Sequence, residues 1–196
     1  MIAIVDTGGA NLASVLNALA RLGAEGEVVC DPARLRAAER VILPGVGAAP
    51  EAAARLAGPL GEAVRGLKVP VLGICLGMQL LFDHSAEGNT ACLGVIPGAA
   101  ARFPGTAGLP VPHMGWNSLD GIADAPLLGG IAPGDHAYFV HSYALPVSPA
   151  TTATADYGGP FSACVSWHNF HGTQFHPERS ALVGARVLSN FLTLCS

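Results

Sequence analysis

The sequence is poor in charged residues, and those it has are not concentrated anywhere. Only 12% of the 196 residues are Asp, Glu, Lys or Arg, the formal net charge is −4, and Lys68 is the single lysine. The basic residues form no cluster of the kind that neutralises a phosphate backbone. We therefore expect no binding to nucleic acid.

Long apolar segments are also missing. Mean hydropathy is positive at +0.44, but glycine, proline or a charge interrupts each apolar stretch before it reaches the roughly 18 residues that span a membrane. Residues 1–6 read as the start of a strand rather than as a basic and apolar leader. We therefore expect no membrane segment and a cytoplasmic protein.

Paired cysteines are absent as well. The five cysteines are widely spaced and include no C-x-x-C pair, which argues against disulfides and against a zinc ribbon. Three histidines could be interpreted as the ligands of a metal ion, but their spacing matches no zinc pattern. They are His168, His171 and His176. We expect a reducing compartment, no metal and no cofactor. The cysteines are Cys30, Cys75, Cys92, Cys164 and Cys195.

Apolar residues, glycine and proline are abundant instead. The chain is 51% hydrophobic and contains 25 glycines and 15 prolines, a balance typical of an α/β protein with both sheet faces covered. Its length suits a single domain, residues 1–196, with a mostly parallel central sheet flanked by helices. Strands are predicted at residues 2–5, 27–30, 40–43, 71–74, 99–103, 137–143, 151–157, 162–165 and 172–175, and helices at 11–22, from about 50 onwards and at 181–192.

The most informative stretch surrounds Cys75. Residues 71–74 read as a buried strand and residues 78–82 as the first turns of a helix, so Cys75 is predicted on the sharp turn between them. Gly73 and Gly77 lack the Cβ atoms that would collide there. The start of a helix also favours a thiolate. The pattern predicts a nucleophile elbow, because the alternative of a buried apolar cysteine leaves both glycines unexplained.

A second glycine-containing turn follows the strand at residues 40–43. Pro44, Gly45, Val46 and Gly47 would leave backbone N–H groups unpaired and open to a ligand. If this strand lies beside the Cys75 strand, those donors face the sulfur across one edge of the sheet. Taken alone, the stretch reads better as a plain turn before a helix.

A nucleophilic cysteine needs a base, because an ordinary thiol with a pKa of roughly 8.5 is mostly protonated at neutral pH. His176 is the best candidate: it follows the last predicted strand, and Pro177 favours an extended backbone at His176. Glu178 would emerge on the same side and orient the imidazole. Without the Pro-Glu that follows it, His176 would be interpreted as structural.

Two weaker signals point elsewhere. Gly8 and Gly9 follow the first strand, but the G-x-G-x-x-G spacing of a dinucleotide site is absent. His136 and His141 fall on opposite faces of one predicted strand. They cannot share a ligand, and we interpret them as structural.

Two motifs together closely resemble a known family. Residues 73–79, Gly-Ile-Cys-Leu-Gly-Met-Gln, and residues 174–178, Gln-Phe-His-Pro-Glu, are similar to the class I, triad-type glutamine amidotransferases. Within that family, further stretches resemble the glutaminase subunits of imidazole glycerol phosphate synthases, which act in histidine biosynthesis. The resemblance covers nearly the whole chain. The further stretches are residues 11–15, 44–47, 93–98, 112–117 and 138–143.

The resemblance implies a role for each site residue and additional antiparallel strands beside the parallel sheet. Cys75 would attack the side-chain amide of glutamine, His176 would protonate the departing ammonia and later activate water, and Glu178 would orient His176. Backbone N–H groups would hold the oxyanion, and further residues would contact the substrate. The implied oxyanion and substrate residues are Gly45, Val46, Gly47, Leu76, Gln79, Ser142 and Tyr143.

A partner is also implied. Ammonia would pass to a (β/α)8 barrel cyclase subunit on another chain, which makes imidazole glycerol phosphate and aminoimidazole carboxamide ribotide. We interpret Trp116, on a glycine-containing turn with Met114 beside it, as a hot spot for this partner, the alternative being a core tryptophan. The implied interface residues are His113, Met114, Gly115, Trp116 and Asn117.

Other functions remain open at this stage. The glutaminases of anthranilate and aminodeoxychorismate synthases share the chemistry but lack the Pro-His-Met-Gly-Trp-Asn stretch. The chain could also be a binding module whose elbow is catalytically inactive and which regulates a partner. The presence of Cys75, His176 and Glu178 argues against this alternative. Residues 48–50, Ala-Ala-Pro, depart from the family pattern and leave the shape of the adjacent loop open.

Overall fold

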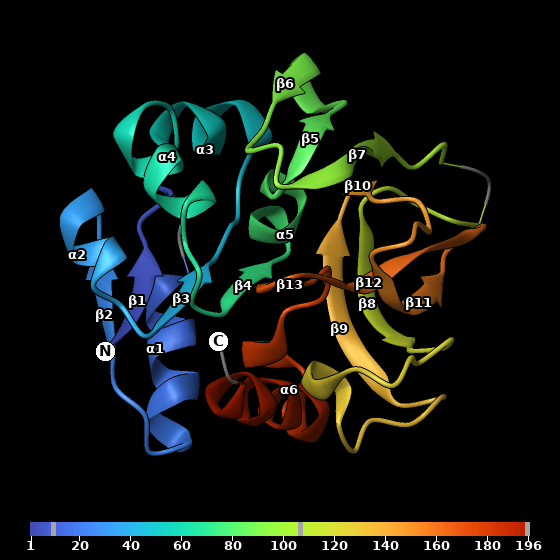
Figure 1. Ribbon diagram of the computed structural model, residues 1–196. Coiled ribbons are helices and arrows are strands. Elements are labelled where there is room, and N and C mark those ends of the chain that lie inside the picture. The colour runs from blue at the N-terminus through green and yellow to red at the C-terminus, as the bar shows by residue number, and fades with distance from the viewer. Residues whose placement is uncertain (9–10, 106–107, 195–196) are drawn as a thin grey trace.

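A seven-stranded sheet forms the centre of the computed structural model, which describes residues 1–8, 11–105 and 108–194, so that Gly9, Ala10 and Cys195 lie outside the described residues. The strand order is β11-β12-β13-β4-β3-β1-β2 (Figure 1). Strands β13, β4, β3, β1 and β2 pair in parallel, whereas β12 pairs antiparallel with β11 and β13. The predicted mostly parallel sheet is confirmed. Its strands are β1 (Ile2–Val5), β2 (Gly26–Val29), β3 (Arg40–Leu43), β4 (Val71–Ile74), β11 (Thr151–Asp156), β12 (Pro160–Trp167) and β13 (Phe170–Thr173).

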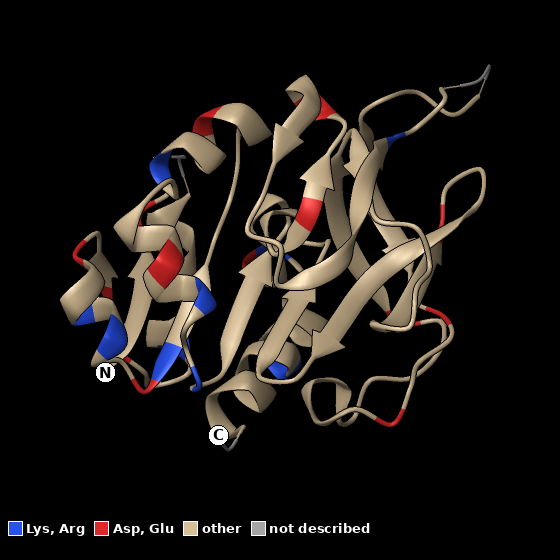
Figure 2. Ribbon diagram, turned by 45° about the horizontal axis from the view of Figure 1, so that its top comes forward, with Lys and Arg blue, Asp and Glu red and all other residues tan. Residues whose placement is uncertain are grey.

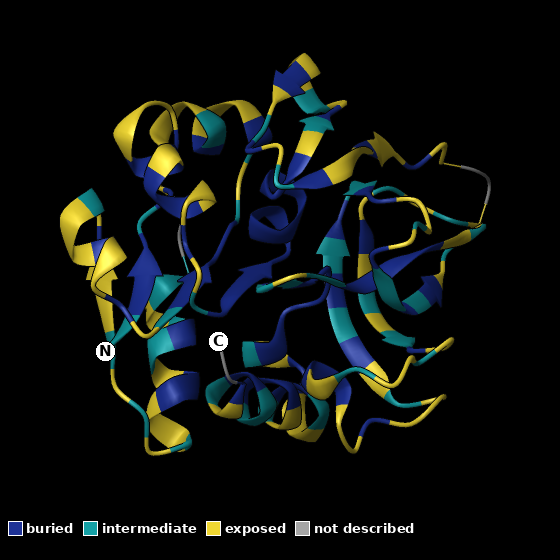
Figure 3. Cartoon of the chain, viewed as in Figure 1, coloured by how far each residue is buried: buried dark blue, intermediate teal, exposed yellow. Residues whose placement is uncertain are grey.

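Helices cover both faces of this sheet. Because side chains alternate along a strand, Ile4 of β1 packs on the face covered by α1 and α6, whereas Ala3 and Val5 pack on the face covered by the other helices. In Figure 3 the central strands are buried along their length. The helices are α1 (Leu12–Arg21), α2 (Pro32–Arg36), α3 (Ala49–Arg55), α4 (Pro59–Arg65), α5 (Leu76–Leu80) and α6 (Ala181–Thr193), with 3-10 turns at Glu87–Asn89, Pro126–Leu128 and Pro177–Arg179.

Two smaller sheets lie beside the central one. One has four strands in the order β10-β7-β5-β6, and the other pairs β8 with β9. They account for the additional strands that the resemblance implied. The strands predicted at residues 99–103 and 137–143 overlap β7, β9 and β10, whereas β5, β6 and β8 were not predicted. Their strands are β5 (Phe82–Ser85), β6 (Thr90–Ala91), β7 (Ile96–Arg102), β8 (His113–Ser118), β9 (His136–His141) and β10 (Tyr143–Ala144).

The helix after Cys75 is shorter than predicted. It ends at Leu80, and Phe82, predicted as helical, begins β5 opposite Ile96 of β7. A short apolar run suits a buried helix and a buried strand equally well, so periodicity could not separate them. Pairing with a strand further along the chain decided the outcome.

The prediction that Trp116 lies on a turn is also wrong. Trp116 lies in the middle of β8, directly opposite Tyr138 of β9. Gly115 has a φ of 139°, yet it remains paired with Phe139. A glycine beside a tryptophan suggested a turn, but cross-strand pairing overrode that local signal.

Charged residues are sparse over the whole fold (Figure 2). Lys and Arg are spread over several elements, as their positions in the sequence indicated. Across residues 1–8, 11–105 and 108–194, no helix has the length and apolar character needed to cross a membrane.

The crossing of α5 over the end of β3 is a very close backbone contact. A Cβ at Gly77 would overlap the carbonyl oxygen of Leu43, and one at Gly45 would lie 2.5 Å from the backbone nitrogen of Gly77. A Cβ at Gly73 would lie 2.7 Å from the backbone nitrogen of Met78. The predicted collisions are therefore present, and glycine permits this approach.

We predict that Gly77→Ala lowers the free energy of unfolding by about 1–3 kcal/mol, because α5 must move away from β3 to make room. Urea denaturation measures this change. The matched control is Gly66→Ala at the end of α4, where a Cβ would have 3.4 Å to its nearest neighbour and φ is −82°. The control should stay within about 1 kcal/mol of the parent. Equal effects in the two variants would contradict the proposed crowding at Gly77.

Candidate active site

Cys75 lies between β4 and α5 with its backbone in a strained conformation. Its φ is 53° and its ψ is −109°, a region that residues with a Cβ rarely occupy. The backbone N–H donates to the carbonyl of Thr173 in β13 at 2.7 Å, which fixes the turn to the neighbouring strand. The residue is only 6% exposed. The predicted elbow geometry is thus present, and the thiol borders a cavity.

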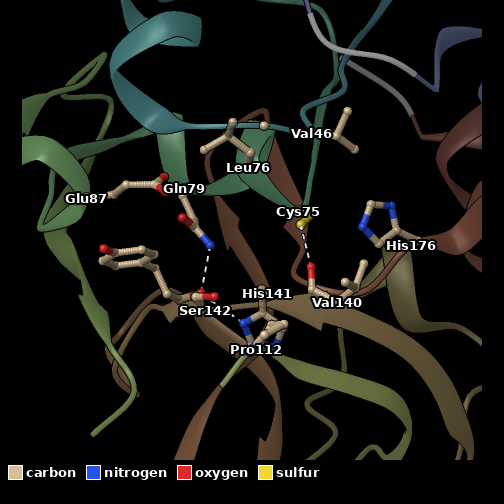
Figure 4. Close-up of a pocket in the computed structure, with 12 residues that line it drawn as sticks. Val46, Cys75, Leu76, Gln79, Glu87, Pro112, Val140, His141, Ser142 and His176 are labelled. Atoms are coloured by element: carbon tan, nitrogen blue, oxygen red, sulfur yellow. Dashed lines mark hydrogen bonds between the residues drawn. The ribbon is translucent and has the colours of Figure 1, made fainter. Parts of the chain in front are cut away.

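The cavity has a volume of about 270 Å³ and opens along one edge of the central sheet. Figure 4 shows Cys75 and His176 projecting into it from different elements. Of the implied oxyanion and substrate residues, all line it except Gly45, which packs behind it against Gly77. The lining residues are Val46, Gly47, Cys75, Leu76, Gln79, Glu87, Pro112, Val140, His141, Ser142, Tyr143 and His176.

His176 is held by its neighbour in the sequence. It follows β13 in an extended conformation, φ −95° and ψ 99°, as the following proline predicted. Its Nδ1 lies 2.8 Å from Oε1 of Glu178, and the two side chains are only 3% and 1% exposed. Because a carboxylate can only accept, Nδ1 carries the proton. Among the described residues, no atom forms an aligned hydrogen bond with Nε2.

The protonation of His176 depends on two opposing effects. Burial alone would lower the pKa of His176, but interactions with Cys75 and Glu178 outweigh it and raise that pKa to about 10. Each of the two partners carries a negative charge when ionised, and a nearby opposite charge favours the imidazolium. At neutral pH the ring is therefore cationic when the thiolate is present.

Other polar groups surround the sulfur. Nε2 of Gln174 donates to Sγ of Cys75 at 3.6 Å, and Sγ lies 3.8 Å from the carbonyl oxygen of Val140. Nε2 of Gln79 donates to the carbonyl of Tyr143 and to Oε1 of Gln174, both at 2.9 Å. Gln79 thus connects the β4 side of the cavity to β10.

Several backbone N–H groups close to Cys75 are available as hydrogen-bond donors. Among the described residues, none accepts a hydrogen bond from the N–H of Val46, Gly47 or Leu76. Because β3 pairs with β4, the turn after β3 lies beside the elbow. The hydroxyl of Thr7 donates to the carbonyl of Pro44 at 3.1 Å and ties this turn to the loop after β1. These N–H groups are available to an anionic atom near the sulfur.

Sequence reasoning missed part of the cavity. Glu87 lies in no motif, Pro112 and Val140 lie in family-like stretches but were not assigned to the site, and His141 was interpreted as structural although it lines the cavity. Among the residues that the structure describes, Glu87 is the only carboxylate in the lining, and its Oε2 accepts from the backbone N–H of Ala49 at 2.8 Å. An acidic residue in a loosely patterned stretch carries no signal that could have identified it.

A buried histidine pair connects β8 to the cavity wall. Nδ1 of His113 lies 3.0 Å from Nε2 of His141, whose own Nδ1 donates to the carbonyl of Tyr143 at 2.8 Å. Burial lowers the pKa of His113 to about 4 and, with the charges of its neighbours, that of His141 to about 3. Both rings are neutral at pH 7. Because the single ring proton of His141 is on Nδ1, its Nε2 is an acceptor, and Nδ1 of His113 donates to it.

The implied interface residues divide between surface and interior. Met114 and Trp116 are 62% and 54% exposed, and the ring of Trp116 lies 6.0 Å from that of Tyr138. His113 is buried in the histidine pair, and Nδ2 of Asn117 donates to the carbonyl of Asp156 at 2.8 Å. Only part of this stretch is therefore available to a partner.

Comparison with known proteins identifies the family of this chain. The family model for "Glutamine amidotransferase class-I" matches residues 3–195. "Imidazole glycerol phosphate synthase subunit HisH" of Xylella fastidiosa is 54% identical over 194 residues, which cover 98% of this chain and 97% of that protein. The protein of the same name from Xanthomonas campestris is 56% identical with the same coverage.

Solved structures share the fold at low identity. A putative GMP synthase component from Thermoplasma acidophilum is 20% identical with a TM-score of 0.76, and the match covers 97% of this chain and 91% of that one. The glutaminase domain of Trypanosoma brucei CTPS, solved with bound acivicin, is 14% identical with a TM-score of 0.68, and the match covers 100% of this chain and 94% of that one. The chain belongs to the class-I glutamine amidotransferase family.

Proposed function

We propose that this chain is the glutaminase subunit of an imidazole glycerol phosphate synthase. It hydrolyses glutamine to glutamate and passes the ammonia to a (β/α)8 barrel cyclase subunit, which forms imidazole glycerol phosphate and aminoimidazole carboxamide ribotide in histidine biosynthesis. The name and the full-length coverage of relatives that are 54% and 56% identical support the pathway. One observation supports the chemistry above all: Cys75, with its strained backbone, lines the same cavity as His176, and the buried carboxylate of Glu178 holds His176 in place.

The triad residues have separate roles in this mechanism. The Cys75 thiolate attacks the side-chain carbonyl carbon of glutamine, and the resulting tetrahedral intermediate collapses as the His176 imidazolium protonates the departing nitrogen. Ammonia leaves and a glutamyl thioester remains on the sulfur. Neutral His176 then removes a proton from water, which attacks the thioester and releases glutamate and the thiolate. Glu178 keeps the Nδ1 proton in place throughout.

The oxyanion of each tetrahedral intermediate would lie among the free backbone donors. Val46, Gly47 and Leu76 border the cavity near the sulfur and have no acceptor for their N–H groups among the described residues. Preorganised donors of this kind stabilise developing charge without reorganisation, and loss of one typically costs about a hundredfold or more in rate. Gly45 contributes by allowing the turn to approach α5.

The polar lining suits the two ends of glutamine. Glu87 lines the cavity and provides a negative charge for the substrate ammonium group. Gln79 and the backbone at Ser142 and Tyr143 provide polar groups on the same side. This arrangement selects an amino acid whose amide reaches Cys75.

The exposed side chains of β8 provide the surface for the cyclase subunit. Met114 and Trp116 are large, apolar and more than half exposed, as interface anchors are before they bind. β8 pairs with β9, which supplies Val140 and His141 to the cavity wall. A partner on this face would therefore lie close to the site where ammonia forms.

The cytoplasm is the proposed location. The cysteines that the structure describes, Cys30, Cys75, Cys92 and Cys164, are all free thiols, which suits a reducing compartment.

Replacing Cys75 by Ala tests the proposed function. Glutamine-dependent synthesis by the complex with the cyclase subunit should fall to background, because no sulfur remains to form the thioester. Synthesis from added ammonium salts should continue, since the cyclase needs only ammonia. Cys30→Ala, which removes an exposed thiol outside the cavity, is the control and should retain both activities. Glutamine-dependent product from the Cys75→Ala complex would refute the nucleophile assignment.

The titration of His176 provides a pH test. Because its folded pKa of about 10 exceeds the ordinary value of 6.5, protonation of His176 stabilises the fold fully below about pH 6.5, and this contribution is lost as the pH rises through 10. Cys75→Ala removes one of the two partners that raise the pKa, so the pKa of His176 should fall. An NMR titration of the ring measures it, with His171, whose pKa is lowered by burial alone, as an internal reference. An unchanged pKa would show that Cys75 does not interact with His176.

Glu87→Gln should weaken glutamine binding, because the neutral amide removes the charge that faces the substrate ammonium group. We expect KM for glutamine to rise about tenfold or more, with a smaller change in kcat. The control is Glu62→Gln on α4, an exposed carboxylate outside the cavity. If KM is the same for the parent and the Glu87→Gln variant, another group binds the ammonium.

A further inference from the structure

Asn11 occupies an unusual position at the start of α1. Its backbone is left-handed, with φ 92° and ψ 3°, a conformation that Gly and Asn tolerate better than other residues. Asparagine before a helix normally accepts a hydrogen bond from the first turn. Here the side chain makes no such capping bond. It is directed to another part of the molecule instead.

The amide of Asn11 reaches the carboxylate of the triad. Its Nδ2 donates to Oε1 of Glu178 at 2.5 Å, across 167 positions in the sequence. The same oxygen accepts from Nδ1 of His176 at 2.8 Å. Among the described residues, Oε2 of Glu178 has no partner. Two donors from different elements therefore converge on one carboxylate oxygen.

A buried carboxylate needs hydrogen-bond donors in place of the water that it has lost. The Glu178 side chain is 1% exposed, so it has lost nearly all of its contact with water. Burial of an ionised group is costly unless hydrogen bonds replace its hydration. The amide of Asn11 is the only donor to this carboxylate besides the ring it orients, among the residues that the structure describes.

We propose that Asn11 is a positioning residue for the glutaminase reaction: its amide hydrogen-bonds the Glu178 carboxylate and fixes it in place, so that His176 keeps its proton on Nδ1 and directs Nε2 to the cavity. This inference rests on the proposed function. The position requires both a left-handed backbone and an amide donor. Asparagine meets both requirements, whereas glycine meets only the first and glutamine only the second.

A double-mutant cycle of Asn11→Gly and Glu178→Gln tests this role. Asn11→Gly keeps the left-handed backbone and removes the amide. In the complex with the cyclase subunit, Asn11→Gly alone should lower kcat for glutamine hydrolysis about tenfold or more, with KM within about twofold, because Asn11 does not line the cavity. In the Glu178→Gln background the same change should cost less than about twofold, because Asn11 acts through that carboxylate. Equal losses in both backgrounds would show a merely structural role and overturn the proposal.

Two further variants separate the amide from the backbone. Asn11→Asp has the same shape but presents an oxygen where the donor was, so it should be at least as impaired as Asn11→Gly when both are assayed at about pH 8. Parent-level activity in Asn11→Asp would contradict the proposal. His168→Gly places glycine at another left-handed position, φ 54°, in the exposed turn between β12 and β13, and should leave kcat unchanged.

A readout without substrate distinguishes failure of this proposal from failure of the proposed function. The His176 Nδ1 proton should give a protected, downfield NMR signal in the parent and exchange with solvent about tenfold faster in Asn11→Gly. If the parent releases no glutamate but this difference is observed, the proposed function fails and the positioning role stands. If the parent is active and the exchange rates are equal, the positioning role fails alone.

Discussion

The close approach of α5 to the end of β3 is the constraint on which the site depends. Gly77 touches the carbonyl of Leu43, and Gly45 touches the backbone of Gly77, so the elbow and the turn after β3 are held against each other. This contact leaves Cys75 no room for an ordinary turn and keeps its φ at 53°. It also places the free N–H groups of that turn beside the sulfur. Strain at the proposed nucleophile and the free backbone donors beside it thus have one structural cause.

Parallel pairing brings the other half of the site to the same edge. β13 lies next to β4, with Thr173 opposite Ile74, so the residues that follow both strands emerge together. That is how His176 reaches Cys75 across about half the length of the chain. The loop after β1 adds Asn11 and Thr7, which contact Glu178 and the carbonyl of Pro44. The ends of β1, β3, β4 and β13 therefore all contribute to one cavity or its support.

The sequence predicted the elements whose signal is local. The elbow, the turn at 44–47 and the Pro-Glu after His176 each follow from steric requirements of a few adjacent residues, and the strands predicted at 2–5, 40–43, 71–74 and 151–157 match β1, β3, β4 and β11 closely. The cavity positions of Glu87 and Val140 and the strand conformation of Phe82 could not be predicted, because they follow from pairing of β5 with β6 and β7 and of β8 with β9, between distant segments. Asn11 appeared in the sequence only as part of a family-like stretch, since its contact depends on the left-handed backbone and on a partner 167 positions away.

The central claim is that a buried sulfur is made reactive by its surroundings, and covalent labelling tests it most directly. A glutamine-shaped alkylating agent offered to the protein in complex with its cyclase subunit should modify Cys75, which is 6% exposed, and leave the exposed Cys30 untouched. Peptide mass spectrometry identifies the modified residue. The account predicts an adduct on Cys75 that is lost when His176 is replaced by Ala. Labelling that follows exposure and falls on Cys30, or labelling of Cys75 that does not depend on His176, would contradict it.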